Sequence, residues 1–317
     1  MIPSIGHKII KISGGSIPAV YGYFAGGITV STVYVATTDR IIFSTGVTSL
    51  NTASNLSGIR GYTSSLSDCS TYGYFAGGTS GASVATTDRV VFSTGVTSVN
   101  TVSNLSVVRY SAAGVSDGVT YGYFVGGYST ANVATTDRIA FSTGATSANT
   151  ISNLSAIKRH AAGLSDKNTY GYFTAGYTTT YSATTDRVVF STGATSANTA
   201  SNLSSARWGH IGVSDQSTYG YIGGGNTGAS IVATDRLVFS TSVSSANTVS
   251  NLSVARYGMA GVSDSTTYGY FAGGSGAGGQ VATTDRIVFS TGATSANTVS
   301  NLSVARWAIM GISDFSV

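Results

Sequence analysis

The chain repeats the segments Thr267-Tyr-Gly-Tyr-Phe-Ala-Gly-Gly274, Thr283-Thr-Asp-Arg-Ile-Val-Phe-Ser-Thr-Gly292 and Ser300-Asn-Leu-Ser-Val-Ala-Arg306 six times with little change. The tyrosine that opens the unit stands at positions 21, 72, 121, 170, 219 and 268, so the spacing is 51 residues once and 49 residues four times. Short runs rich in Val, Ile, Tyr, Phe and Thr, separated by glycine, favour strands and turns. A period of about fifty residues with this content predicts a β-propeller in which each unit is one blade.

Each unit resolves into four short runs separated by turn residues, which predicts four-stranded antiparallel blades. In the last copy the first run is residues 256–264, the second 267–274 and the third 285–291, and the fourth lies within 297–303. We expect the inner runs to be covered on both sides, because blades pack face to face.

The ends of the array indicate how the ring closes. The second, third and fourth runs occur six times between Tyr21 and Ser303, but the segment before Tyr21 does not match a first run. The sixth first run is residues 307–314, at the end of the chain. We therefore predict an all-β, six-bladed β-propeller over residues 19–317, with its ring closed by the C-terminal strand so that no free edge remains there. Residues 1–18 are left over as an N-terminal arm or an extra strand.

Several motifs of the unit resemble Kelch repeats over about residues 20–314. They are the diglycine that closes the second run, an aromatic residue that ends the third run, and Leu-x-x-x-Arg before the next unit. The regular tryptophan of the Kelch fourth strand is missing, and Asn-Thr-x-Ser-Asn-Leu-Ser stands in its place. Kelch-like proteins share a fold and not one activity, so the resemblance implies a propeller and no particular function.

The charged residues follow the repeat almost completely. All twelve aspartates fall at two positions of the unit, and the chain has no glutamate. We predict that one aspartate set and the basic residue before each first run form a structural ion-pair lattice that links strands or adjacent blades. The members of this lattice are Asp39, Asp88, Asp137, Asp186, Asp235 and Asp285 with Arg60, Arg109, Arg207, Arg256 and Arg306, and Lys158 fills the basic position of the remaining unit.

The same inventory argues against catalysis. Acid–base chemistry needs a group whose environment differs from that of its copies, and no acid stands outside the repeat. The histidines His7, His160 and His210 show no metal-ligand spacing, and the single cysteine, Cys69, cannot form an intramolecular disulfide. The sequence therefore predicts a protein that is not an enzyme and that binds no cofactor and no metal.

Charge and hydropathy limit the partners and the location. The net charge is +4, but the basic residues are spaced along the repeat and form no concentrated stripe of the kind that nucleic acids need. No apolar run approaches the ~20 residues of a spanning helix, and the N-terminus lacks the apolar core of a secretory signal. We expect no nucleic-acid partner and no membrane insertion. We expect a soluble protein, either in a virion or extracellular after lysis, or otherwise cytoplasmic, and a homo-oligomer is compatible with the sequence.

Every unit carries an Asn-x-Ser triplet, which has two interpretations. It is the acceptor motif of N-glycosylation, but that use requires secretion. We favour the second interpretation, in which the amide side chains hydrogen-bond backbone groups at a strand end. The six residues are Asn55, Asn104, Asn153, Asn202, Asn251 and Asn301.

The copies differ mainly in the connection between the second and third runs and at the start of the first run. In an up-and-down blade these segments open on the same face, so we expect them to converge on one rim around the mouth of the central channel. Tyrosine, tryptophan, histidine and arginine with small polar residues suit flat, hydroxyl-rich ligands such as glycans. The alternative is drift in exposed loops. The candidate ligand-binding residues are Trp208, His210, Trp307, Tyr110, Tyr257, Arg159, His160, Tyr128 and Tyr177.

These features predict a non-enzymatic binding or structural propeller. Highly similar, Ser/Thr/Asn/Gly-rich and lysine-poor repeats resemble those of virion appendages, including bacteriophage tail or surface proteins. That resemblance implies that the rim recognises a host-surface glycan or another virion protein and that residues 1–18 attach the module. A cellular Kelch-like adaptor for protein–protein interactions is the alternative.

Overall fold

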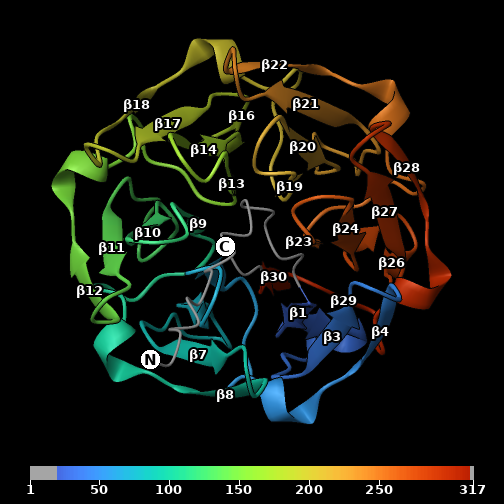
Figure 1. Cartoon of the computed structure of the whole chain (residues 1–317), viewed down its shortest axis with the longest axis horizontal. Helices are drawn as coiled ribbons and strands as arrows, with labels where there is room; N and C mark the ends of the chain where they lie inside the picture. The colour runs from blue at the N-terminus through green and yellow to red at the C-terminus, as the bar shows by residue number, and fades with distance from the viewer. Residues whose placement is uncertain (1–19, 315–317) are drawn as a thin grey trace, which may run out of the picture.

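The computed structural model of the chain describes residues 20–314, and within them six four-stranded antiparallel sheets lie in a ring (Figure 1). The predicted all-β, six-bladed propeller is therefore confirmed. The predicted arm or extra strand, residues 1–18, lies outside the described residues.

In blades 2 to 6 the strands are paired in chain order, starting with the strand nearest the channel. Blade 2 is β5 (Ser64–Ser67), β6 (Tyr72–Ala76), β7 (Thr87–Val91) and β8 (Val96–Val99); blade 3 is β9 (Ala113–Ser116), β10 (Tyr121–Val125), β11 (Thr136–Ala140) and β12 (Ala145–Ala148). Blade 4 is β13 (Ala162–Ser165), β14 (Tyr170–Thr174), β17 (Asp186–Val189) and β18 (Thr195–Ala197); blade 5 is β19 (Ile211–Ser214), β20 (Tyr219–Gly223), β21 (Thr234–Val238) and β22 (Val243–Ala246); blade 6 is β23 (Ala260–Ser263), β24 (Tyr268–Ala272), β27 (Thr284–Val288) and β28 (Ala293–Ala296).

Blade 1 combines the two ends of the described chain. Its inner strand is β30 (Met310–Ser313), which pairs antiparallel with β1 (Tyr21–Ala25) so that Ile312 lies opposite Tyr23. The blade continues with β3 (Thr38–Ile42) and β4 (Val47–Leu50). Figure 1 shows β30, in red, beside β1, in blue. The predicted closure of the ring by the C-terminal strand is confirmed.

Within residues 20–314, six two-residue strands pair outside the blades: β2 (Ile28–Thr29) with β29 (Arg306–Trp307), β15 (Gly176–Tyr177) with β16 (Tyr181–Ser182), and β25 (Ser275–Gly276) with β26 (Gly279–Gln280). The helices of the described residues are single 3₁₀ turns, none of them long or apolar enough to cross a membrane. These turns are η1 (Val30–Thr32), η2 (Thr52–Ser54), η3 (Thr101–Ser103), η4 (Thr150–Ser152), η5 (Thr199–Ser201), η6 (Thr248–Ser250) and η7 (Thr298–Ser300).

The predicted position of the fourth strand was wrong. In blade 6 that strand is β28, residues 293–296, and the segment proposed for it, 297–303, begins with the 3₁₀ turn η7. The reason is a tight turn at Gly292, which has a φ of +69° and whose N–H donates to the carbonyl of Val288 at 2.8 Å. Because glycine adopts this left-handed conformation easily, the chain reverses immediately after the third strand and the fourth strand starts earlier.

The predicted role of the Asn-x-Ser triplets is confirmed. The backbone N–H of Thr38 donates to Oδ1 of Asn55 at 2.8 Å, and the other five asparagines accept the corresponding bond at 2.9–3.0 Å. Each amide thus satisfies the backbone at the start of a third strand.

Apolar side chains fill the space between neighbouring blades. One core cluster combines Leu66 and Tyr74 of blade 2 with Phe124 and Ile139 of blade 3. The glycine in the second strand permits this approach, since a Cβ on Gly122 of blade 3 would lie 2.7 Å from Cδ1 of Leu66 in the inner strand of blade 2. Removal of this surface from water is the main favourable term in folding.

Among the described residues, six buried ion pairs, one at each crossover, link the crossover to the blade that follows it. Arg109 precedes the inner strand of blade 3, and its Nη2 lies 2.7 Å from Oδ2 of Asp137 in the third strand of that blade. The same Nη2 donates to the carbonyl of Phe124 at 3.1 Å, and the carboxylate also accepts from the N–H of Ser106 at 3.1 Å. The other pairs are Arg60–Asp88, Lys158–Asp186, Arg207–Asp235, Arg256–Asp285 and Arg306–Asp39, at 2.5–2.9 Å.

A ring of serine hydroxyls joins the blades nearer the outside. The hydroxyl of Ser54, in the crossover after blade 1, donates to the carbonyl of Gly95 in blade 2 at 2.5 Å. Equivalent bonds of 2.5–2.7 Å follow at each crossover, and the bond from Ser300 to Gly46 joins blade 6 to blade 1. The hydrogen bonds therefore run once around the complete circle.

The ion pairs give a first prediction. In Asp137→Asn the Arg109 guanidinium remains buried without its counter-charge, so the free energy of unfolding should fall by ~3–5 kcal/mol in urea titration. Arg138→Gln is the matched control, because its half-buried guanidinium lies 4.2 Å from the ring centroid of Tyr121 and makes no ion pair among the described residues. Arg138→Gln should lower the free energy of unfolding by only ~1 kcal/mol. Equal losses in the two variants would contradict the assignment.

Ring closure gives a second prediction. A chain that ends at Ala308 keeps Arg306 but lacks β30, so β1 becomes an open edge and the cooperative thermal transition should be lost or shifted strongly downward. A synthetic peptide of residues 309–317 added in trans should restore the transition, and a scrambled peptide should not. An unchanged melting curve for the truncated chain would rule out closure by this strand.

Candidate ligand-binding face

The two variable segments of each unit lie side by side at one end of the ring. Tyr110, before the inner strand of blade 3, exchanges backbone hydrogen bonds of 3.0 and 2.9 Å with Tyr128 in the connection after the second strand. Arg159 and Tyr177 of blade 4 form the same pair at 3.0 and 2.8 Å. We call this end, formed by both segments of all six blades, the variable face.

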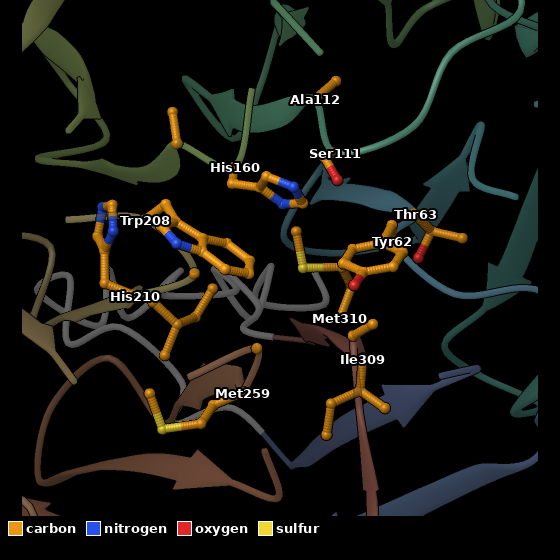
Figure 2. Close-up of a pocket in the computed structure, with 15 residues that line it drawn as sticks. Tyr62, Thr63, Ser111, Ala112, His160, Trp208, His210, Met259, Ile309 and Met310 are labelled. Carbon is orange, nitrogen blue, oxygen red and sulfur yellow. The ribbon is translucent and has the colours of Figure 1, made fainter. Parts of the chain in front are cut away.

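Five aromatic side chains from five blades encircle the mouth of the channel on this face. Neighbouring rings of this set lie close together, with centroid distances of 4.8–5.4 Å. These distances are 5.3 Å for Tyr62–His160, 4.8 Å for His160–Trp208, 5.0 Å for Trp208–Tyr257, 5.4 Å for Tyr257–Trp307 and 5.4 Å for Trp307–Tyr62. Figure 2 shows Tyr62, His160 and Trp208 of this set pointing toward the same space. We call these five residues the mouth ring.

The backbone beneath the mouth ring is held in an unusual conformation. Tyr62, Ser111, His160 and Ala308 have φ values of +54° to +55°, which side-chain-bearing residues adopt rarely. The N–H of Tyr62 donates to the carbonyl of Ala308, that of Ser111 to Tyr62, and that of His160 to Ser111, at 2.8–3.0 Å. These bonds between neighbouring blades offset the strain and fix the direction of the mouth-ring side chains.

A small cavity of about 50 Å³ lies under the mouth ring. Typical ligand pockets measure ~300–1,000 Å³, whereas a water molecule needs only ~10–15 Å³ of such space. Thr63, Ser111 and His210 line the cavity, and each has a buried polar side-chain atom without a protein partner. The cavity is therefore too small for a sugar.

A larger groove of about 590 Å³ lies beside the mouth ring, over blades 1 to 4. Tyr62 and Tyr110 have ring centroids 5.8 Å apart, and Tyr110 and Tyr128 have ring centroids 5.3 Å apart, so three rings form a continuous wall. We call it the tyrosine groove, and it is lined by Tyr34, Tyr62, Thr79, Gly81, Ser83, Tyr110, Tyr128, Ser129, Arg159 and His160.

Arg159 carries the positive charge of this groove. Its guanidinium carbon lies 4.8 Å from the ring centroid of Tyr128 and 5.1 Å from that of Tyr177, within the range of cation–π contacts. Within residues 20–314 it makes no ion pair. The corresponding residues of the other copies are Gly61, Tyr110, Trp208, Tyr257 and Trp307, so this charge belongs to one blade only.

Two histidines near the groove are held in the neutral form. Burial, and then the charge of Arg159, lower the pKa of His160 to about 3. Burial, and then the charge of Arg207, lower the pKa of His210 to about 3, and its Nε2 lies 3.0 Å from both the carbonyl and the hydroxyl of Thr174. At neutral pH neither imidazole adds to the positive charge of the face.

The structure separates the candidate residues into three groups. Tyr110, Tyr128, Arg159 and His160 line the tyrosine groove, with Tyr177 beside Arg159. Trp208, Tyr257 and Trp307 belong to the mouth ring, which His160 joins to the groove. His210 is 4 % exposed and lies in the small cavity.

Sequence reasoning did not select Tyr34 and Tyr62, which also line the groove. A signal was present, because both lie in variable segments and Tyr62 stands where the other copies have Ser, His, Gly, Gly and Ala. The distances that make them part of one surface depend on the side-by-side placement of blades 1 to 4.

The opposite face has hollows of a different kind. One of about 560 Å³ is lined by Asp215, Thr218 and Tyr219, which recur in the other units, together with Lys167 and Gln216, which do not. Among residues 20–314, no group of three or more His, Cys, Asp or Glu is arranged to hold a metal ion. Cys69 is buried, and its burial raises the pKa of the thiol to about 12.

Comparison with known protein families and curated proteins assigns the chain to no family. No protein-family model matches the chain, and a search of curated proteins finds no match. The Kelch-like resemblance therefore stays a prediction from motifs, and function has to be argued from the geometry of the variable face.

His210 gives a prediction of pH dependence. Its folded-state pKa of about 3 lies below the usual 6.5, so the unfolded chain takes up a proton that the folded chain excludes, and stability should fall as the pH drops below 6.5. The loss between pH 7 and pH 5 should be roughly 2 kcal/mol for this residue. His210→Met, which installs the residue of the next copy, should reduce the pH dependence by that amount in urea titrations. An identical pH dependence in both proteins would show that His210 is not held neutral.

Proposed function

We propose that this chain is a non-enzymatic binding module that recognises a glycan in the tyrosine groove. A six-bladed propeller is a common scaffold for binding or structural modules. The observation that carries the proposal is a groove of about 590 Å³, walled by tyrosine rings, on the face where the repeats stop agreeing. Its volume lies within the range of known ligand pockets.

The lining has the two properties that sugars require. Tyrosine rings offer flat apolar faces for the C–H surface of a pyranose, and their hydroxyls reach polar groups at the edge. Thr79, Ser83 and Ser129 add hydroxyls around the same groove. Such a surface can bind a polar sugar by ring stacking and hydrogen bonding.

The absence of catalysis is part of the proposal and rests on the placement of the acids. Six aspartates are fully buried in the ion pairs, and the other six, such as Asp117, accept backbone hydrogen bonds at the opposite end of the inner strands. Among the described residues no carboxylate lines the tyrosine groove, so a general acid or base of that type is missing there.

We place this module on a virion appendage, where it would be extracellular after lysis and would bind a host-surface glycan or another virion protein. This placement is supported by the near-identity of the Ser/Thr/Asn/Gly-rich units, which resemble the repeats of virion appendages. The units differ mainly in the segments that form the variable face. A cellular protein–protein adaptor is the competing proposal.

A glycan array tests this function. The wild-type chain should bind a restricted set of glycans, and Tyr128→Ala should weaken that binding about five- to thirtyfold, since a stacked ring contributes ~1–2 kcal/mol. Tyr219→Ala removes a half-buried tyrosine from the opposite face and should leave binding unchanged. Binding to a protein partner without any glycan, unaffected by Tyr128→Ala, would favour the adaptor.

A further inference from the structure

Arg159 stands apart from every other arginine of the chain. Of the twelve, five hold the buried ion pairs, and six lie over the tyrosine that opens the unit, at 4.1–4.8 Å from the ring centroid. Those eleven serve the scaffold and recur from blade to blade. Arg159 is the twelfth, it occurs in one copy only, and it lies in the tyrosine groove.

The surroundings of Arg159 position its charge. Two backbone hydrogen bonds of 3.0 and 2.8 Å fix its main chain to Tyr177, and the rings of Tyr128 and Tyr177 lie near the guanidinium. Contacts with ring faces leave the donors at the guanidinium edge for a planar acceptor, and a carboxylate matches that edge with two parallel bonds.

The charges of the variable face make an anion the favoured ligand. The lattice aspartates are 0 % exposed, and the second aspartate set lies at the far ends of the inner strands, so in the described part of the chain no acid compensates Arg159. His160, next to it, is neutral at physiological pH because burial lowers its pKa. A cation without a counter-charge, inside a groove lined by hydroxyls, attracts an acidic group at short range.

We propose that the tyrosine groove selects an acidic glycan and that Arg159 binds the carboxylate of one of its sugars. The inference rests on the proposed function and narrows it to sugars that carry a carboxylate, such as uronic or sialic acids. The tyrosine rings hold the sugar body, and Arg159 distinguishes the acid from its neutral counterpart.

Matched pairs of glycans test this assignment. An array carries each carboxylated glycan beside its neutral and its sulfated counterpart, and dissociation constants are measured for the pairs that bind. The wild-type chain should prefer the carboxylated member at least about tenfold, and its binding, unlike that of the neutral member, should weaken as salt rises.

The variants separate the charge from the fold. Arg159→Gln should weaken binding of the carboxylated glycan about ten- to a hundredfold and leave the neutral one within about twofold, while Arg159→Lys keeps part of the preference. Arg138→Gln removes a stacked guanidinium from the scaffold and should leave the preference intact. Melting curves of all variants check that the fold is retained.

The outcomes are distinct. Equal binding of acidic and neutral glycans, or a preference that survives Arg159→Gln, overturns the role of Arg159 and leaves glycan binding standing. A stronger, Arg159-dependent preference for the sulfated member overturns the assignment to a carboxylate. If no glycan binds, both this inference and the proposed function fail.

Discussion

Every crossover between blades brings a cation into the protein interior, and that cation must meet a carboxylate there. Arg109 is 1 % exposed and Asp137 is 0 % exposed, and the other five pairs are similarly buried. A charge in such a place costs several kcal/mol without its partner, so each crossover has one favourable position against the next blade. The hydrogen bonds from serine hydroxyls to the next blade add a second constraint on each crossover, further from the channel. Together they determine where the six blades stand, and therefore where the variable segments meet.

The scaffold and the proposed binding site use the same residue types in different ways. A guanidinium beside tyrosine rings occurs at Arg138, where it covers Tyr121 in a contact that recurs in every blade. At Arg159 the same chemistry occurs once, in the tyrosine groove of the variable face. Binding specificity on a repeat scaffold has to come from such departures, because a residue present in all units creates equivalent sites around the ring.

The sequence predicted the fold well because its signals are local and repeated six times. The period, the strand runs and the terminal first run sufficed for six blades and for the closure in blade 1. The fourth strand was misplaced because Thr298 and Val299 have strand-like character, while the deciding feature was the turn at Gly292. At this position the turn geometry outweighed the local strand propensity.

The candidate site was predictable only in part. Variation between copies indicated the correct segments, and Tyr110, Tyr128, Arg159 and His160 lie together as one surface. The division into a packed mouth ring and an open groove was not visible, because it depends on the left-handed backbone at the start of each inner strand. Gly209 and Gly258 at that position were the available hint, since glycine favours such a conformation. The extent of the groove over blades 1 to 4 depends on how the closed ring places the variable residues of these blades side by side.

The closed ring is therefore the claim to test most directly, with an engineered disulfide across its closure. Ala25 lies opposite Met310 in the pairing of β1 with β30, and residues opposite one another in antiparallel strands are close enough for a disulfide. Ala25→Cys combined with Met310→Cys should form an intramolecular bond in nearly every molecule, whereas Ala25→Cys with Ile309→Cys should not, because successive side chains point to opposite faces. A bond that forms only between molecules, or with the shifted partner, would contradict the closure on which the variable face depends.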